Sequence, residues 1–323
     1  MASGRVTGAA MGSTDGNRQL RKKRRRNSLT VLSFLSLWLI GFTGLFLYAI
    51  GQTLAYSFTD YNLMNDAIWI GLANYTNLIF NDAVFWTTLA NTGFFVVLLV
   101  PGILILAFML ALLVNRKTRI ANWASVAYFL PFIIPLAATG LVWRWMFNGD
   151  YGVVNYLFSL FHLEGPSWLT SSHWVKPAIA IAELTLVGQY MIIFAAALQD
   201  VPKELYEAAD IDGASGWRKI LHISLPMVSP AALFNFITCL IAEFQIFEIP
   251  YVMTLNGGSS MQAKASGGPG WSSTTFAMYM YDKMFSEYDA GTATAMAILS
   301  LVIVLAIAFP VMRLSQRLVN YER

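Results

Sequence analysis

Charged residues are scarce in this sequence. Aspartate, glutamate, lysine and arginine together make up 12% of the 323 residues, whereas 57% of the residues are apolar. A soluble globular protein usually carries about 25% charged residues, which solvate its surface. This composition argues against a soluble globular fold and predicts that lipid is the solvent for most of the chain.

Cysteine is almost absent as well. The single cysteine, Cys239, lies in an apolar segment, so the chain can form neither an internal disulfide framework nor a redox pair. The three histidines, His162, His173 and His222, fall on two sides of the predicted bilayer and cannot converge on a metal ion. No nucleophile elbow or Ser–His–Asp pattern is present. We therefore predict no catalytic residue, no metal site and no enzyme.

Long uncharged stretches dominate what remains. A helix needs about 20 apolar residues to cross the hydrocarbon core, because each backbone amide must find its partner within the segment. Six segments of sufficient length carry two acidic residues or fewer; they are residues 29–59, 83–115, 120–143, 177–199, 223–256 and 290–312. The sequence therefore predicts an all-α, polytopic membrane protein with six transmembrane helices.

Basic residues are distributed unevenly between these spans. Residues 1–28, 115–121, 200–226 and 313–323 hold 17 of the 21 lysines and arginines. Positively charged segments remain on the cytoplasmic side, so both termini are predicted to be cytoplasmic. Residues 1–28 form a basic tail that we expect to be disordered. An uncharged stretch follows the tail directly, which favours a membrane-facing role over nucleic-acid binding. Residues 29–323 form the transmembrane domain.

The longest predicted cytoplasmic loop, residues 200–226, is organised into two short helices. Asp200 is a candidate N-cap and Pro202 falls in the first turn of a helix over residues 203–212. Gly213 then supplies a stop that tolerates a positive φ angle.

The second helix of this loop follows at once. Ser215 is placed to cap it, it runs through His222, and Pro226 is expected to end it. Two short helices joined by a glycine turn make a compact knob, which suits a rigid contact with a soluble partner. An ordinary amphipathic loop lying at the lipid headgroups is the alternative.

Ionisable groups within the predicted spans mark candidate functional positions. Such a group costs at least about 2.5–3.5 kcal/mol at mid-membrane, so it usually faces a cavity or a partner. Glu183 and Gln189 are six residues apart in the fourth span and are expected on different helical faces. Acids and amides bind sugar hydroxyls, and aromatic rings cover the C–H faces of a sugar. The residues predicted to line a carbohydrate path are Gln189, Glu243, Gln245, Phe247 and Glu248. Hydrogen bonding between helices, or a pair with Arg144, is the alternative.

One pattern in the cytoplasmic loop resembles a known signature. Glu207-Ala208-Ala209, then Asp212-Gly213, then Ile223-Ser224-Leu225-Pro226 resemble the EAA signature of ABC importer permeases. Ile220 stands where this pattern often has phenylalanine. The spacing matches, and the motif lies on the predicted cytoplasmic side.

The resemblance extends over most of the chain, to the maltose-type carbohydrate permease family. The matching residues are Tyr56-Ser57-Phe58-Thr59-Asp60, Gly71-Leu72-Ala73-Asn74-Tyr75, Asn91-Thr92, Trp143, Gly152, Asn155, Tyr251-Val252-Met253-Thr254, Gly267-Gly268-Pro269, Asp289, Gly291 and Ala293. In that family the threonine leads almost directly into Gly-Gly-Pro, so the outer loop over residues 255–270 is enlarged here. Residues 1–28 match nothing in the family.

The resemblance implies the type I ABC importer permease fold, in a bacterial cytoplasmic membrane. In that family the EAA loop forms a coupling helix that docks into a cleft of a cytoplasmic ATPase. Glu207 and Asp212 would contact the ATPase, Ala208 and Ala209 would keep the packing close, and Gly213 would make the turn. Ile223, Leu225 and Pro226 would connect the knob to the fifth span.

The resemblance also implies partners. These are a second permease subunit, two ATP-binding subunits, an extracytoplasmic solute-binding protein and a carbohydrate, with no nucleic acid. The chain contains no G-x-x-x-x-G-K-[ST] loop for nucleotide phosphates, so ATP and Mg²⁺ are expected on the partner ATPase and no cofactor on this chain.

Other functions stay open at this point. A permease for glycerol phosphate or a polyol would share these features. An ion-coupled secondary transporter would use Glu183, Glu243 and Glu248 as proton or sodium sites, although no inverted repeat is evident. A membrane receptor without transport would not need the organised loop.

Overall fold

The computed structural model describes residues 31, 33–36, 38–115, 118–255 and 267–318. The chain divides into two compact units, Met1–Ala55 and Tyr56–Arg323, and each is described by itself. The basic tail over residues 1–28 and residues 256–266 of the enlarged outer loop lie outside the described residues. In the first unit, the helical segment Ser33–Tyr56 contains the π-helix η1 (Phe42–Leu47) and continues as α2 (Tyr48–Tyr56).

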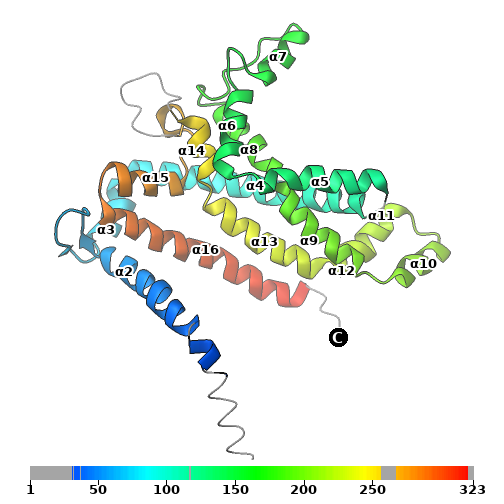
Figure 1. Ribbon diagram of the computed structural model, residues 1–323, viewed down its shortest axis with the longest axis horizontal. Helices are drawn as coiled ribbons and strands as arrows, with labels where there is room; N and C mark the ends of the chain where they lie inside the picture. Colours follow the sequence, from blue (N-terminus) through cyan, green and yellow to red (C-terminus); the bar gives the residue numbers. More distant parts are fainter. Residues whose placement is uncertain (1–30, 32, 37, 116–117, 256–266, 319–323) are drawn as a thin grey trace, which may run out of the picture. The chain divides into compact units, whose positions relative to one another are not determined.

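The second unit is organised around α4 (Ala83–Val114), a helix of 32 residues. Its N-terminus is capped by Asp82, whose Oδ1 accepts hydrogen bonds from the backbone amides of Val84 (2.9 Å) and Phe85 (3.1 Å). The helix packs against several other helices of this unit, as Figure 1 shows. They include α8 (Val175–Leu184), α9 (Gly188–Gln199), α13 (Ser229–Phe244) and α15 (Phe276–Tyr281).

The third predicted span is helical but sharply bent. It consists of α5 (Arg119–Ile133) and α6 (Leu136–Met146), whose axes differ by 103°. Ile134, which separates the end of α5 from Pro135, has an extended backbone. Proline disfavours the helical conformation of the residue before it, so the helix ends there.

The fourth span changes its helical type near its middle. The 3₁₀-helix η3 (Thr185–Val187) separates α8 from α9. The next residue, Gly188, lies against the backbone of α5, where a Cβ atom would come within 2.1 Å of the Tyr128 carbonyl oxygen. Only glycine allows this close helix crossing.

The fifth span is interrupted between α13 and α14 (Glu248–Thr254) at residues 245–247. Pro250 has no N–H to donate to the carbonyl of Ile246, four residues earlier. The Thr275 hydroxyl, from just before α15, donates to that carbonyl instead, at 2.8 Å. An interruption of this kind is tolerated within a membrane only where other groups satisfy the freed backbone atoms.

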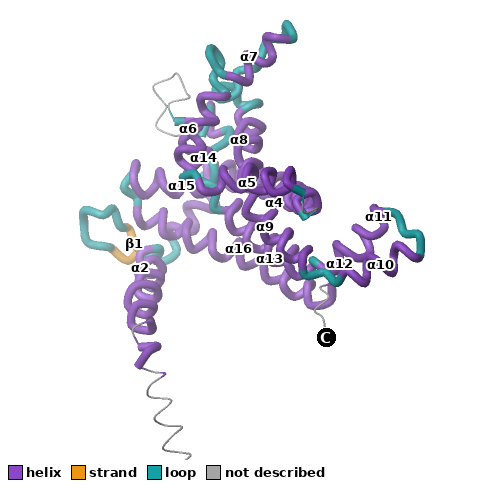
Figure 2. The backbone as a smooth tube through the Cα atoms, turned by 45° about the vertical axis from the view of Figure 1, so that its right-hand side comes forward, coloured by secondary structure: helices purple, strands orange, loops and turns teal. Residues whose placement is uncertain are grey.

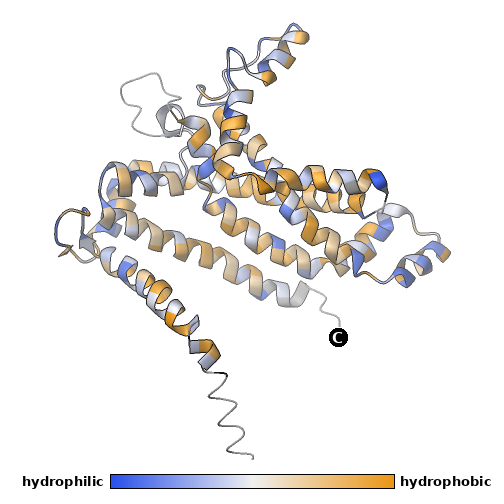
Figure 3. Ribbon diagram, in the orientation of Figure 1, coloured by the Kyte–Doolittle hydropathy of each residue, from blue (hydrophilic) through white to orange (hydrophobic). Residues whose placement is uncertain are grey.

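The membrane-spanning capacity matches the prediction of a polytopic α-helical protein. Within the described residues, five segments are long and apolar enough to cross a bilayer, and the bent α5–α6 pair makes a sixth. The span nearest the C-terminus is the apolar part of α16 (Ala290–Leu318). Large apolar side chains on these helices face outward, among them Val97 (75% exposed) and Val302 (55%), and hydrophobic colour covers the helices in Figure 3. Lipid is the solvent that this surface requires.

Short elements outside the 200–226 loop also connect the spans. Figure 2 shows how little strand the described chain contains. The elements are β1 (Thr59–Asp60), β2 (Ile68–Trp69), α3 (Ala73–Thr76), η2 (Asn77–Asn81), α7 (Val153–Leu160), η5 (Pro269–Trp271) and η6 (Asp282–Ser286). The two strands pair antiparallel, Thr59 with Trp69 and Asp60 with Ile68.

Buried asparagines tie these outer elements together. Asn74 Nδ2 donates to the carbonyls of Ser57 (3.0 Å) and Thr59 (2.9 Å). Asn91 Nδ2, on α4, donates to the carbonyls of Trp271 (2.8 Å) and Thr274 (2.9 Å), 180 or more residues later in the chain. Each amide donates to two backbone carbonyls and thereby ties separate segments of the chain together.

Candidate functional site

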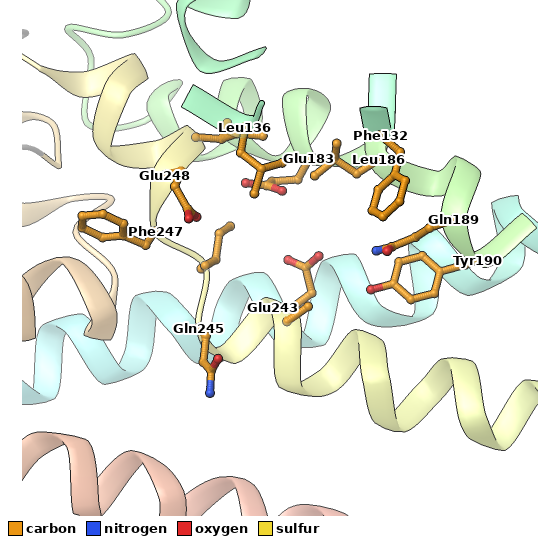
Figure 4. Close-up of a pocket in the computed structure, with 13 residues that line it drawn as sticks. Phe132, Leu136, Glu183, Leu186, Gln189, Tyr190, Glu243, Gln245, Phe247 and Glu248 are labelled. Carbon is orange, nitrogen blue, oxygen red and sulfur yellow. The ribbon is translucent and has the colours of Figure 1, made fainter. Parts of the chain in front are cut away.

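The three interrupted spans meet at one cavity of about 260 Å³. Its walls come from α5, α6, the fourth span and the interruption of the fifth span. The lining residues are Phe132, Leu136, Glu183, Leu186, Gln189, Tyr190, Ala242, Glu243, Gln245, Ile246, Phe247, Glu248 and Ile249 (Figure 4). Irregular backbone inside a membrane protein typically lines a binding cavity, because only there can its polar groups be satisfied.

Three carboxyl groups face this cavity. Glu183 and Glu243 are each 5% exposed, whereas Glu248, the first residue of α14, is exposed. Glu243 Oε2 is buried and has no hydrogen-bond partner in the protein. Figure 4 shows the three side chains directed towards the same space from three helices. A buried carboxyl oxygen without a partner is costly unless a ligand or water supplies one.

Within the described residues, no basic side chain neutralises these acids. Two ion pairs are present there, Lys219 with Asp210 and Lys283 with Glu287, and both lie outside the cavity. Arg144, the expected alternative partner, pairs with none of the three glutamates. The Lys176 ammonium group lies 5.1 Å from the centre of the Phe94 ring. The cavity is therefore acidic.

Amide and aromatic groups complete the lining. All five residues predicted for the carbohydrate path, Gln189, Glu243, Gln245, Phe247 and Glu248, line this one cavity. The Gln245 amide points away from the three carboxyl groups in Figure 4. Whether these residues contact substrate stays a prediction, but the structure brings them together.

One geometric expectation was wrong. Glu183 and Gln189 line the same cavity although six residues of regular α-helix would place them on different faces. The 3₁₀-helix Thr185–Val187 between them has three residues per turn, which brings positions six apart back to one side. Sequence analysis also missed Phe132, Leu136 and Tyr190, since nothing in an apolar run distinguishes a cavity-lining residue from a lipid-facing one.

The loop over residues 200–226 begins with α10 (Lys203–Ile211), as predicted within one residue. Asp200 does not cap it: Pro202 occupies the N-cap position with extended backbone, so the helix begins at Lys203, and no side chain caps it. Gly213 ends it with a φ angle of +69°. The Gly213 amide donates to the Asp210 carbonyl (3.1 Å) and the Ala214 amide to the Ala209 carbonyl (2.9 Å), the pattern of a Schellman cap.

The second half of the loop differs from its prediction. Helix α11 (Gly216–Lys219) has Ser215 at the N-cap position, but the Ser215 side chain makes no cap hydrogen bond. The chain then continues as the π-helix η4 (Ile220–Ser224) and as α12 (Leu225–Met227). Pro226 therefore does not end the helical path, because it falls in the first turn of α12, where no N–H is required.

Two contacts hold the two halves of this loop together. The hydroxyl groups of Tyr206 and Ser224 hydrogen-bond at 2.9 Å, and Lys219 forms an ion pair with Asp210. Ser224 is 2% exposed, so the α10 helix is fastened to a buried point directly before the fifth span. The loop is thus a folded unit in which the two halves are held together by side-chain contacts.

The surface of the loop remains open. Residues of the signature that are exposed are Glu207, Ala208, Asp212, Gly213 and Leu225, and those that are half-buried are Ala209, Ile223 and Pro226. Other large apolar side chains of the same loop also face outward, most of all Ile211 (87% exposed) and Trp217 (63%), and to a lesser degree Leu205 and Leu221. Figure 3 shows hydrophilic colour on much of α10.

The sequence matches one protein family and several characterised relatives. Residues 102–320 match the model of a family described as the binding-protein-dependent transport system inner membrane component. The chain is 35% identical to the sulfoquinovosyl glycerol transport system permease protein of Agrobacterium fabrum over 254 residues, which covers 78% of this chain and 79% of the relative. It is 34% identical to the lactose transport system permease protein of Rhizobium radiobacter, which covers 71% and 74% of the two chains.

A solved structure shares the fold. A chain of a bacterial alginate ABC transporter, crystallised in complex with an alginate pentasaccharide-bound periplasmic protein, superposes with a TM-score of 0.78. The match covers 91% of this chain and 96% of that chain at 21% sequence identity. This likeness shows that the two chains share the same fold.

Proposed function

The chain belongs to the family of binding-protein-dependent transport system inner membrane components, and from this premise we propose that it is one transmembrane half of an ATP-driven carbohydrate importer. It is a multi-pass membrane protein, and we place it in the bacterial cell membrane with both termini in the cytoplasm. Its relatives include transport permeases named for sugars. A glycerol phosphate or polyol permease is less well supported by those names.

The observation that carries the proposal is the cytoplasmic loop. It is short, fastened at two points and yet exposes the apolar side chains of Ile211 and Trp217. Exposed apolar groups beside the charged residues of this knob suit a protein partner. We assign this partner as an ATP-binding subunit, with Glu207, Asp212 and the turn at Gly213 in the contact. ATP and Mg²⁺ would bind to that subunit.

The connection from the loop to the cavity is direct. Tyr206 fastens α10 to Ser224, η4 and α12 continue from there, and α13 follows with its last residues at the cavity. A displacement of the loop by an ATPase would move α13 and hence Glu243. The interruption at residues 245–247 lets α13 move relative to α14, because no backbone helix bonds connect the two at that point. This element gives alternating access a hinge.

Substrate recognition would occur in the cavity. Its carboxyl and amide groups accept hydrogen bonds from sugar hydroxyls, and the rings of Phe247 and Tyr190 offer apolar faces. The volume of about 260 Å³ is smaller than the ~300–1,000 Å³ of pockets that hold drug-sized ligands, so it suits one sugar residue at a time. A solute-binding protein would deliver the carbohydrate, and a second permease subunit would complete the path.

An ion-coupled transporter is the second candidate, favoured by the Glu243 Oε2 atom, which has no hydrogen-bond partner, in a broken span.

Uptake of radiolabelled oligosaccharide into proteoliposomes distinguishes the ATP-driven importer from the ion-coupled transporter. The vesicles contain this chain with a partner permease and an ATP-binding subunit, and the binding protein is added outside. We expect uptake that requires internal ATP and persists with an uncoupler. Uptake without ATP that an uncoupler abolishes would reject the ATP-driven function.

A further inference from the structure

The charge of the cavity lining carries an inference about the class of sugar that enters. Three of its thirteen lining residues, Glu183, Glu243 and Glu248, are ionisable acids, and none is lysine, arginine or histidine. The basic residues at the ends of the neighbouring helices, Arg144 and Lys176, do not line the cavity. Tyr190 is the remaining titratable group of the lining, and it carries no positive charge.

Glu243 gives this acidic lining a specific recognition element. Its side chain is 95% buried, its Oε2 atom has no partner in the protein, and it points into the cavity (Figure 4). A ligand hydroxyl or ammonium group would satisfy that oxygen by donating a hydrogen bond. A carboxylate, a sulfonate and a doubly ionised phosphate group have no proton to donate. Its negative charge would also lie beside three carboxyl groups, two of them buried, with no basic side chain in the lining to offset it.

We propose that this cavity selects sugar residues that are neutral or carry an amine, and that it rejects uronate, phosphate and sulfonate groups. Glu243 is the principal determinant of this selection and Glu248 contributes to it at the open side. The inference rests on the proposed function, because it names the substrate class of the same cavity. It goes beyond it by excluding sugar phosphates and acidic sugars.

The selection is tested by direct binding, which avoids any choice made earlier by the solute-binding protein. The assembled permease–ATPase complex is placed in nanodiscs, and dissociation constants are measured by saturation-transfer difference NMR. The probes are methyl glucoside, glucosamine, glucuronate and glucose 6-phosphate, which share one ring and differ in charge. We expect the two acidic probes to bind about tenfold more weakly, or worse, than the neutral and amine-bearing probes.

Two variants tie the selection to its residues. Glu243→Gln is expected to weaken glucosamine binding about tenfold. It should also bring the ratio of the glucuronate and methyl glucoside dissociation constants close to one. Glu248 is exposed, so Glu248→Gln should not disturb folding. It should weaken glucosamine binding and change the ratio of dissociation constants in the same direction as Glu243→Gln, but by a smaller factor. Glu164→Gln removes one negative charge from the exposed outer loop and should change neither.

The outcomes separate this inference from the proposed function. Equal binding of all four probes to the wild-type complex would overturn the charge selection and leave a carbohydrate cavity in place. Retained discrimination in both Glu243→Gln and Glu248→Gln would also overturn the assignment to these residues. Absence of binding for every probe would instead contradict the carbohydrate cavity itself.

Discussion

The Thr275 hydroxyl donates a 2.8 Å hydrogen bond to the carbonyl oxygen of Ile246, 29 residues earlier in the chain. Pro250 leaves this carbonyl without its helical donor, so Thr275 repairs the interruption of the fifth span at the edge of the cavity. The same hydroxyl accepts a hydrogen bond from the Met278 amide (3.2 Å) and thereby caps α15. One buried side chain therefore holds two elements in place.

Replacement of Thr275 tests this role. Thr275→Val preserves the shape of the side chain but leaves the Ile246 carbonyl and the Met278 amide unpaired. We expect a loss of about 1–3 kcal/mol in the free energy of unfolding. It should appear as a lower midpoint of thermal unfolding for the detergent-solubilised protein. Thr275→Ser keeps the hydroxyl and should remain close to the wild type. Equal stability of the valine and serine variants would show that the bond does not matter.

The turn at Gly213 should be essential for transport and tolerant of one replacement. The φ angle of +69° is closed to proline, and proline would also remove the amide that bonds to Asp210. We expect Gly213→Pro to reduce uptake to background while the protein still inserts into the membrane. Gly213→Asn should retain most uptake, since asparagine adopts positive φ at low cost. Similar uptake for both variants would contradict the need for this turn geometry.

Glu207, an exposed acid of the EAA signature, should be needed for coupling to the ATPase but not for insertion of the chain into the membrane. Charge reversal by Glu207→Lys is expected to abolish uptake and the substrate-stimulated ATPase activity of the complex, because it places a positive charge in the predicted contact. Membrane levels, measured by immunoblot, should be unchanged. Glu164→Lys, on the outer side, serves as the matched control and should transport normally. Full uptake by Glu207→Lys would remove this residue from the contact.

The stability of the outer segment should depend on pH through Asp282. Burial, and secondly the nearby charge of Glu287, raise the pKa of this carboxyl group to about 6, and Oδ2 lacks a hydrogen-bond partner. An unfolded aspartate has a pKa of about 3.9, so the folded chain binds the proton more tightly between these values. The contribution of this group to stability is therefore present below pH ~4 and is lost as the pH rises to ~6.

Asp282→Asn should consequently melt several degrees higher than the wild type at pH 7.5 and show little difference at pH 4. The measurement is the unfolding midpoint of the purified protein over this pH range. Asp150→Asn, in an exposed outer loop, is the control and should show no such dependence. A constant difference between wild type and Asp282→Asn across the range would rule out the titration of Asp282 as its cause.

The sequence predicted the features whose causes are local. Apolar length set the spans, and turn chemistry set the stop at Gly213, because only a few residue types tolerate positive φ. Residues that carried the family resemblance, such as Asn74 and Asn91, prove to be hydrogen-bonding anchors of the outer elements. Their identity was visible in the sequence, but their partners, up to 183 residues away, were not.

The features that escaped prediction arise from packing. Gly188 lies against the α5 backbone beside a 3₁₀-helix, which places Glu183 and Gln189 on one side of the span. A sequence shows the glycine but not the neighbour that requires it. The effect of Pro226 was likewise misjudged, since the same residue ends a helix or begins one according to the hydrogen bonds around it.

The most direct test of the proposed mechanism is a cross-link from the cytoplasmic loop to the ATPase. Cys239 is fully buried and can be replaced by serine, so a cysteine introduced by Ala208→Cys becomes the sole reactive thiol. We predict that a short maleimide–benzophenone reagent, attached to this thiol and then photolysed, joins this position to the ATP-binding subunit in inverted vesicles. A membrane-impermeant maleimide should fail to label the thiol in intact cells. Labelling from outside the cell, with no cross-link to an ATPase, would contradict the account.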